Sequence, residues 1–247
     1  MQQVFPEALP RRQSSDTVWS SAHDLEELAL TFAKRGSLVL DDALQATVAQ
    51  AVTRSIDQAG PAFRLVARNG VHPRMMVFDK PLSPAKEAVL RQQLAVAREG
   101  GLFTCIFRLW EIPEPETQDA AWELKRFLMS EECWTWIERI TAIRTMACQV
   151  AGVDEYRAGD YLGAHSDRLV KFGRRRKIAF ALYFGRNWEP GMGGELVLVR
   201  RDGEKERVAP LWNRLVLFDV DRVDKHYSAT VMEDGFNKIS LPGFFCV

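Results

Sequence analysis

The pattern of apolar and polar positions divides the chain into a helix-rich first half and a strand-rich second half. Before residue 142, several segments repeat apolar residues every three or four positions, which is the spacing of amphipathic helices. The first predicted helix starts at the capping pair Ser20-Ser21, and the second runs from Asp41 or Asp42 to about Gln58. A third runs from Ser83-Pro84 to about Arg98, and residues 117–141 form one or two more. Between them, strands are predicted at Ser37–Leu40, at 63–80 with a break at Asn69-Gly70, and at 102–110.

From about Ile143 the pattern changes to short β-type runs separated by Gly, Pro and charged turns. The predicted runs are 143–157, 176–184, 194–200, 213–218, 226–232 and 237–246. This order favours an α+β fold in which the helices cover one face of a barrel or sandwich. We expect residues 1–20 to form a loose arm and 21–247 a single domain, with a helix-rich part at 21–142 and a β core at 143–247.

Composition narrows the class of protein. Hydrophobic residues make up 47% of the 247 positions, which is enough for a sizeable core, and Lys plus Arg equals Asp plus Glu at 33 each. A balanced charge predicts neither nucleic acid nor an anionic membrane as a partner. The first residues are polar, no apolar run is long enough to cross a bilayer, and the oligomeric state stays open. The four widely spaced cysteines (Cys105, Cys133, Cys148 and Cys246) are expected to be reduced, buried thiols of a cytoplasmic protein.

The segment that carries chemistry is His165-Ser166-Asp167. In a strand, residues i and i+2 point to the same face, so His165 and Asp167 can offer a nitrogen and an oxygen to one metal ion. His226, which lies in a later β run, can supply a third ligand. Two histidines and one carboxylate on one side of an ion form the facial triad of non-haem Fe(II) oxygenases, which leaves the opposite positions open.

Each piece of this triad is weak alone, because a His-x-Asp triplet arises by chance and a single histidine is more often structural. The combination is stronger. The chain has only four histidines, and two of them fall at these positions, about sixty residues apart with three intervening predicted strands.

Around the triad, residues 145–247 resemble the 2-oxoglutarate- and Fe(II)-dependent dioxygenases, specifically the prolyl-4-hydroxylase-like branch. Five ordered blocks carry the resemblance: Tyr156-Arg-Ala-Gly before the His-x-Asp triplet, Ile178 to Trp188, Gly193-Gly194-Glu195-Leu196, Pro210 to Phe218, and Gly235 to Phe245 after His226. The resemblance implies a double-stranded β-helix, or jelly roll, with the N-terminal helices packed against it. It also implies Fe(II) with 2-oxoglutarate and O2 as co-substrates, and oxidation of a C–H bond with release of succinate and CO2. Because Asp167 is present, hydroxylation is favoured over halogenation.

The resemblance also assigns the co-substrate pocket. Lys238 stands where the family usually has an arginine that binds the distal carboxylate of 2-oxoglutarate, and Tyr183, Tyr156 and Ser240 match neighbouring binding positions. A lysine can neutralise that carboxylate but cannot make the bidentate contact of a guanidinium. The alternatives are a solvated Lys238 and two core tyrosines. If Lys238 does not bind the carboxylate, the next candidates are Arg214 and the basic run at 174–176.

The substrate site is the least defined. Arg168, directly after the triplet, and Arg74 are candidate substrate contacts, and residues 69–76 are either a lid or an ordinary strand and turn. The basic run Gly173-Arg-Arg-Arg-Lys177 is either a solvated hairpin tip or a rim that attracts an anionic substrate.

These features predict an enzyme that hydroxylates a small molecule, such as a free or carrier-bound amino acid or a natural-product intermediate. The alternatives are a hydroxylase of prolyl or other side chains in proteins, and a non-catalytic barrel that binds a ligand. The intact triad argues against the last of these.

Overall fold

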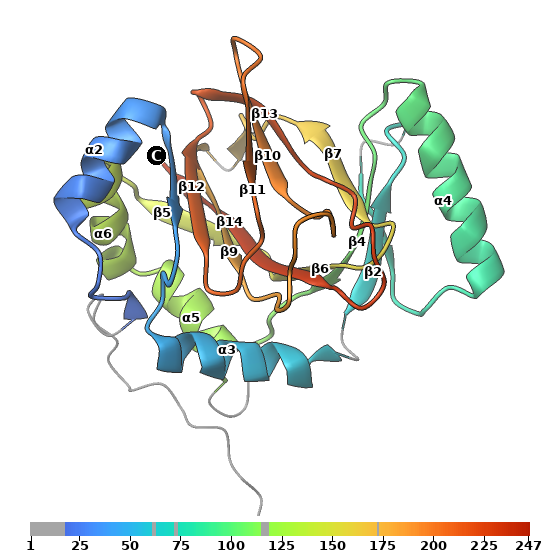
Figure 1. Cartoon of the computed structure of the whole chain (residues 1–247), viewed down its shortest axis with the longest axis horizontal. Coiled ribbons are helices and arrows are strands. Elements are labelled where there is room, and N and C mark those ends of the chain that lie inside the picture. The colour runs from blue at the N-terminus through green and yellow to red at the C-terminus, as the bar shows by residue number, and fades with distance from the viewer. Residues whose placement is uncertain (1–17, 61–62, 72–73, 115–118, 172) are drawn as a thin grey trace, which may run out of the picture.

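The structure is a computed structural model that describes residues 18–247 except 61–62, 72–73, 115–118 and 172 (Figure 1). The predicted loose arm lies outside the described residues up to position 17. Its end is not loose, because Trp19 is 3% exposed and stacks on Trp136 with ring centroids 4.3 Å apart. Stacking of two large rings in the core fixes this part of the arm.

The helices agree with the predicted pattern in their positions, but two of their starts differ. They are α2 (Leu25–Arg35), α3 (Ala46–Gln58), α4 (Pro84–Glu99), α5 (Ala120–Leu128) and α6 (Glu131–Thr141). The predicted cap at Ser20-Ser21 is wrong, because Asp24 accepts the free backbone N–H groups of α2. The predicted cap of α3 at Asp41 or Asp42 is also wrong. That helix begins after Gln45, and Asp41 instead pairs with Arg214.

The strands follow the predicted runs and add three in segments where no separate run was predicted. They are β1 (Ser37–Leu40), β2 (Arg64–Arg68), β3 (Met76–Phe78), β4 (Cys105–Trp110), β5 (Ala147–Val150), β6 (Val153–Tyr156), β7 (Tyr161–His165), β8 (Val170–Lys171), β9 (Arg174–Tyr183), β10 (Leu196–Arg200), β11 (Lys205–Val208), β12 (Leu215–Asp219), β13 (Val223–Ser228) and β14 (Lys238–Cys246). The additional strands are β7, β8 and β11. Five strands therefore separate the two metal-site histidines, not the three expected.

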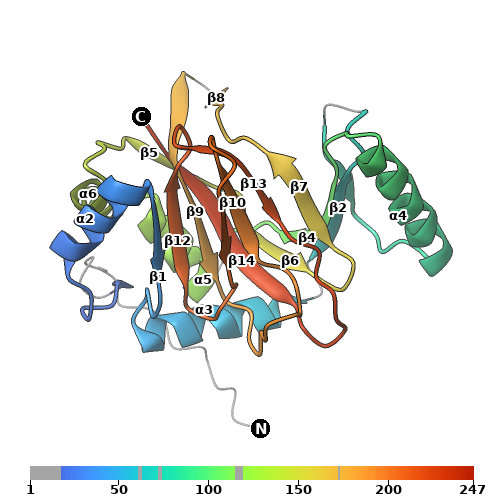
Figure 2. The same cartoon turned by 45° about the horizontal axis from the view of Figure 1, so that its top comes forward.

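The strands form one antiparallel sheet that folds over on itself, in the order β1-β12-β9-β14-β6-β4-β7-β13-β10-β11. β7 pairs with both β4 and β13, so it joins a larger layer to a smaller layer that holds β13, β10 and β11. The larger layer lies between the helices α2, α3, α5 and α6 and the smaller layer (Figures 1 and 2). This arrangement confirms the predicted double-stranded β-helix with N-terminal helices packed against it.

The apolar run in β9 explains why the layers pack this way. Ile178, Phe180 and Leu182 belong to the core formed with the helices, whereas Ala179 and Tyr183 belong to the core between the two layers. A strand buried on both faces is apolar at nearly every position, which is why the segment shows no alternation. The small alanine side chains on the inner face leave space inside the barrel.

Helix α4 lies apart from the other helices, beside β2 and β4 (Figure 1). Its Leu90 and Leu94 pack with apolar side chains of β2 and β4. Arg91 of α4 and Arg108 of β4 both pair at 2.7 Å with Asp160, whose side chain is fully buried directly before β7. These pairs fix the start of the strand that ends at His165. Among the described residues, no helix has both the length and the apolar character that crossing a bilayer requires.

Candidate active site

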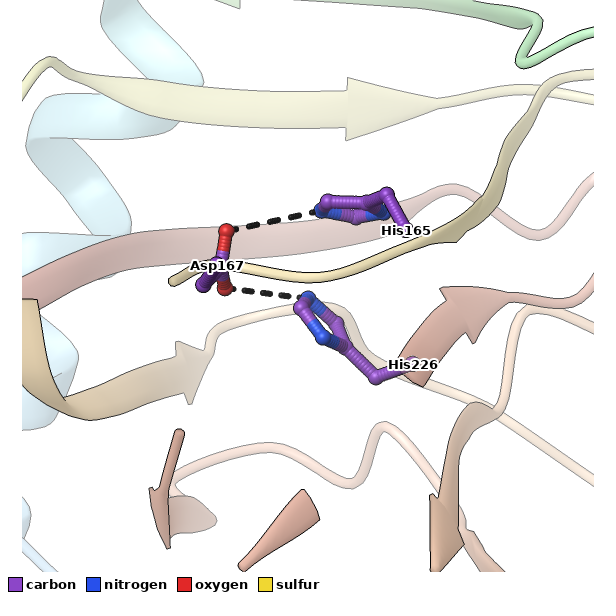
Figure 3. A group of neighbouring side chains, drawn as sticks. All are labelled: His165, Asp167 and His226. Carbon is purple, nitrogen blue, oxygen red and sulfur yellow. Dashed lines mark ion pairs between the residues drawn. The ribbon is translucent and has the colours of Figure 1, made fainter. Parts of the chain in front are cut away.

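The three predicted metal ligands come together inside the barrel. His165 is the last residue of β7, Asp167 follows two residues later, and His226 lies in the middle of β13, directly opposite His165 in the strand register. One donor atom from each of the three lies within 4.8 Å of the others (Figure 3). The site therefore depends on the pairing of β7 with β13, which brings together residues far apart in sequence.

Neighbouring groups set the orientation of both imidazoles. Nδ1 of His165 lies 2.9 Å from the carbonyl oxygen of Gly163, and donation of that N–H leaves Nε2 free to bind a metal. The ring of Phe103 meets the His165 ring edge-on at 5.3 Å, and the ring of Phe218 lies 4.9 Å from that of His226. Hydrogen bonding and packing thus hold two nitrogen donors toward one point.

The donor set fits a divalent metal ion. Nε2 of His165 lies 3.6 Å from Oδ1 of Asp167, and Nε2 of His226 lies 3.2 Å from Oδ2. Two donors bound at right angles to an ion roughly 2 Å away are about 3 Å apart, so the spacing suits three ligands on one face. Burial lowers the pKa of His226 well below its usual value, which keeps this imidazole in the neutral form that binds metals.

Burial acts on the carboxyl group of Asp167 in the opposite direction. Burial raises the pKa of Asp167, although His165 and Arg176 act against the rise. The site thus gathers a desolvated carboxylate and a neutral imidazole, and a bound cation would stabilise both of these states.

Lys238 lies at the other end of the same cavity, at the start of β14. Its side chain is 2% exposed, so the alternative of a solvated charge is wrong. The ammonium group donates a hydrogen bond to Ser228 and lies 4.6 Å from the ring centre of Tyr156 and 5.6 Å from that of Tyr183. Burial lowers its pKa to about 7, opposed by the charges of Asp154 and Glu195. This cation is held among aromatic rings and has no carboxylate within ion-pair distance among the described residues.

The other predicted co-substrate contacts surround Lys238. Tyr156 is its direct neighbour in the β14–β6 register, and Tyr183 lies opposite Ser240 in the β14–β9 register. All three side chains are buried and line the same cavity as the triad. The Tyr156 ring stacks on Phe107 at 5.3 Å. The structure therefore brings the four predicted residues together, and their contact with 2-oxoglutarate stays a prediction.

One cavity of about 920 Å³ contains both ends. His226 of the triad and Ser228, the partner of Lys238, stand two residues apart on β13, and most of the cavity lining is apolar, including Leu109, Leu162, Ala181 and Leu196. A mainly apolar pocket with a few convergent polar groups is typical of small-molecule and cofactor sites.

The basic run after the triad is mostly neutralised. Lys177 pairs with Asp219 at 2.8 Å and with Asp221 at 2.7 Å, and Arg175 pairs with Asp221 at 2.6 Å. These carboxylates lie more than forty residues away in sequence, at the end of β12. Arg176 lines the cavity, stacks over Phe244 at 3.6 Å and pairs with Oδ1 of Asp167 at 3.8 Å.

The two predicted substrate arginines have different surroundings. Arg168 lines the cavity, but its guanidinium donates to backbone carbonyls of Val220 and Asp221, which fixes it against the turn before β13. Arg74 is exposed and is not among the described residues that line the cavity. Two residues of the predicted lid, 72–73, lie outside the described residues, whereas Met75 reaches the cavity wall. Arg214, the alternative carboxylate ligand, pairs with Asp41.

Two cavity residues had no assigned substrate role in the sequence. Arg176 was considered only as part of the basic run, and Asp154 was not considered at all. Asp154 stands two positions before Tyr156 on β6, and both line the cavity. The period of two in a strand was the signal that could have identified it.

Comparisons with known proteins agree with this geometry. Residues 151–246 match the family model of the 2OG-Fe(II) oxygenase superfamily. Over 126 residues the chain is 29% identical to prolyl 3-hydroxylase OGFOD1 of Mus musculus and 29% identical to that of Xenopus laevis. These matches cover 49% of this chain but only 22% and 24% of the relatives, so the chain spans about a quarter of their length.

Solved structures resemble nearly the whole chain. A prolyl-4-hydroxylase of Pseudomonas putida aligns with a TM-score of 0.60 and 18% identity, covering 90% of this chain and 98% of that one. A prolyl hydroxylase of Trichoplax adhaerens, solved with a hypoxia inducible factor peptide fragment, aligns with a TM-score of 0.59 and 13% identity, covering 90% and 88%. At such identities the likeness shows the fold. The family match, the fold and the His-Asp-His cluster agree: residues 151–246 are similar to the 2OG-Fe(II) oxygenase superfamily, and the relatives named here are prolyl hydroxylases.

Proposed function

We propose that the chain is an Fe(II)- and 2-oxoglutarate-dependent oxygenase that hydroxylates an amino-acid side chain, in the first instance a prolyl residue of a peptide or protein. The observation that carries this proposal is the placement of the His165, Asp167 and His226 cluster and the buried cation Lys238 in one cavity. A bound ferrous ion would supply the activation of O2 that the protein side chains cannot provide.

Different residues of the cavity would bind the metal and the co-substrate. The triad would hold the metal by one face and leave the other open to co-substrate and O2. Lys238 would neutralise the distal carboxylate of 2-oxoglutarate, since its charge lies in a nearly dry pocket where a single ion pair is strong. Tyr183 and Tyr156 can offer hydroxyl groups to the same carboxylate. Apolar side chains form most of the lining around the space that 2-oxoglutarate would fill between the metal and Lys238.

The choice of substrate rests on the relatives. Those named above are prolyl hydroxylases, and the Trichoplax protein was solved with a peptide, so they support the protein-hydroxylase alternative over the small molecule expected from sequence. The cavity of about 920 Å³ has room for a side chain with its flanking backbone, and equally for a free amino acid.

The test is iron-dependent formation of succinate from 2-oxoglutarate. The full chain should be incubated with Fe(II), 2-oxoglutarate and O2, with prolyl peptides in one arm and free amino acids in the other. We expect stimulated succinate release and addition of one oxygen atom to a peptide product by mass spectrometry. Stimulation by free amino acids alone would restore the small-molecule prediction. No iron-dependent succinate in any arm would contradict the oxygenase proposal.

A further inference from the structure

Asp154 introduces a negative charge into the wall of this cavity. The residue lies on β6 between Leu109 of β4 and Ser240 of β14, its partners in the strand register. Its side chain lines the cavity on the same face as Tyr156. The next carboxylate along the strand, Glu155, points to the other face, where Arg157 and Asn237 bind it.

The Asp154 carboxylate is half-buried and opens into the cavity. No residue in the described part of the chain donates a hydrogen bond to it or forms an ion pair with it, and loss of water around it raises its pKa to about 7 despite the opposing charge of Lys238. Carboxylates removed from bulk water are normally paired or hydrogen-bonded. A carboxylate kept in this state inside a binding cavity is typical of a group that is satisfied by a ligand.

Binding of 2-oxoglutarate would change the charge balance around Asp154. The charge of Lys238 acts on Asp154 in the free protein, but in the proposed complex that charge is matched by the distal carboxylate of 2-oxoglutarate. Asp154 then faces a second anion, with apolar and aromatic side chains (Leu109, Phe107 and Tyr156) around it. Without a positive charge from another molecule Asp154 would take up a proton, whereas a substrate cation would keep it ionised.

We propose that Asp154 binds a positively charged nitrogen of the substrate, an ammonium or guanidinium group on an aliphatic stem. The apolar and aromatic wall suits the stem, and the Asp154 carboxylate suits the cation. The substrate would therefore bind more tightly once 2-oxoglutarate is in place. This inference rests on the proposed function for the identity of the cavity as the substrate site, and it narrows the substrate to a peptide or amino acid that carries a cationic group beside the hydroxylated position.

The test is equilibrium binding without O2, so that no turnover is needed. The full chain, loaded with Fe(II) and 2-oxoglutarate, should be titrated with three matched pairs of probes: lysinamide and norleucinamide, arginine and citrulline, and prolinamide and N-acetylprolinamide. In at least one pair, the member with the additional positive charge should bind about tenfold to a hundredfold more tightly than its partner. Asp154→Asn should reduce that preference to about twofold, whereas Glu155→Gln, on the other face of the strand, should keep it. Thermal unfolding of both variants checks that they fold.

The contrary results are distinct. If the wild type shows no preference in any pair, or if Asp154→Asn keeps the preference, the inference is wrong. It is equally wrong if Asp154→Asn changes only the affinity for 2-oxoglutarate, because Asp154 would then serve Lys238. Failure of succinate formation with an intact, Asp154-dependent cation preference would instead count against the oxygenase proposal alone.

Discussion

The two ends of the cavity handle charge in opposite ways. At the metal end, three donors from two paired strands converge, and hydrogen bonds or rings hold each imidazole before any ion is bound. At the Lys238 end, a buried cation lies among tyrosine rings, and no carboxylate of the described residues is within ion-pair distance of it. The difference teaches that a cation site needs several converging donors, whereas an anion site needs one charge kept out of water.

Loss of a metal donor should have the largest effect. We expect His165→Ala, Asp167→Ala and His226→Ala each to reduce iron-dependent succinate formation by about a thousandfold or to background, because each removes one of only three protein ligands. The assay should run beside His23→Ala, which alters an imidazole remote from the cavity and should keep wild-type turnover. A triad variant with near-native turnover would show that its residue is not a ligand.

Loss of the buried cation should have a smaller and more selective effect. Lys238→Ala should raise the apparent constant for 2-oxoglutarate about tenfold to a hundredfold, since a charge-assisted hydrogen bond is lost, and change iron affinity little. Lys205→Ala, which removes an exposed lysine on β11, is the matched control. An unchanged co-substrate constant in Lys238→Ala would transfer the role to another cavity cation, with Arg176 the nearest alternative.

The acidity of Lys238 gives a prediction about pH. Its pKa of about 7 is set by burial, against the raising effect of Asp154 and Glu195, while Tyr156, Tyr183 and Ser228 surround it without adding charge. The protonated form that binds 2-oxoglutarate is lost as pH rises through this value. The apparent co-substrate constant should therefore rise roughly fivefold between pH 7 and pH 8.

Replacement of the titrating group is the control for that pH dependence. Lys238→Arg should remove the rise, because a guanidinium stays protonated over this range. A wild-type profile that is flat from pH 7 to pH 8, or an equal slope in Lys238→Arg, would mean that another group controls it.

The smallest effect is expected for a tyrosine hydroxyl. Tyr183→Phe keeps the buried ring beside Lys238 and removes one hydrogen-bonding group, so the co-substrate constant should rise roughly threefold. Tyr227→Phe, at a position on β13 whose side chain does not line the cavity, should leave it unchanged. If both variants match the wild type, the Tyr183 hydroxyl makes no contact with the carboxylate.

The predictability of the two ends from sequence also differs. The triad was predicted because the chain has only four histidines and because His165 and Asp167 stand two positions apart, the spacing of one strand face. The identity of Lys238 was predicted from resemblance alone, while its burial depends on the register of β14 with β6, which no local pattern encodes. Asp154, by contrast, could have been identified from its spacing of two positions from Tyr156 on β6.

The helix and strand assignments also show which features cannot be predicted from local sequence. Positions of helices and strands followed from apolar spacing, but the cap of α2 was placed at Ser20-Ser21 when Asp24 accepts its first N–H groups. A polar segment with several capping residues does not by itself identify the one used. Likewise, the neutralisation of Lys177 by Asp219 and Asp221 depends on strand pairing across more than forty residues.

The most direct test of the central claim is anomalous X-ray diffraction from crystals of the full chain grown without O2 with Fe(II) and 2-oxoglutarate. We predict one iron peak at bonding distance from His165, Asp167 and His226, with the distal carboxylate of 2-oxoglutarate in contact with Lys238. An iron peak away from these three side chains, or a co-substrate carboxylate bound elsewhere than at Lys238, would contradict it.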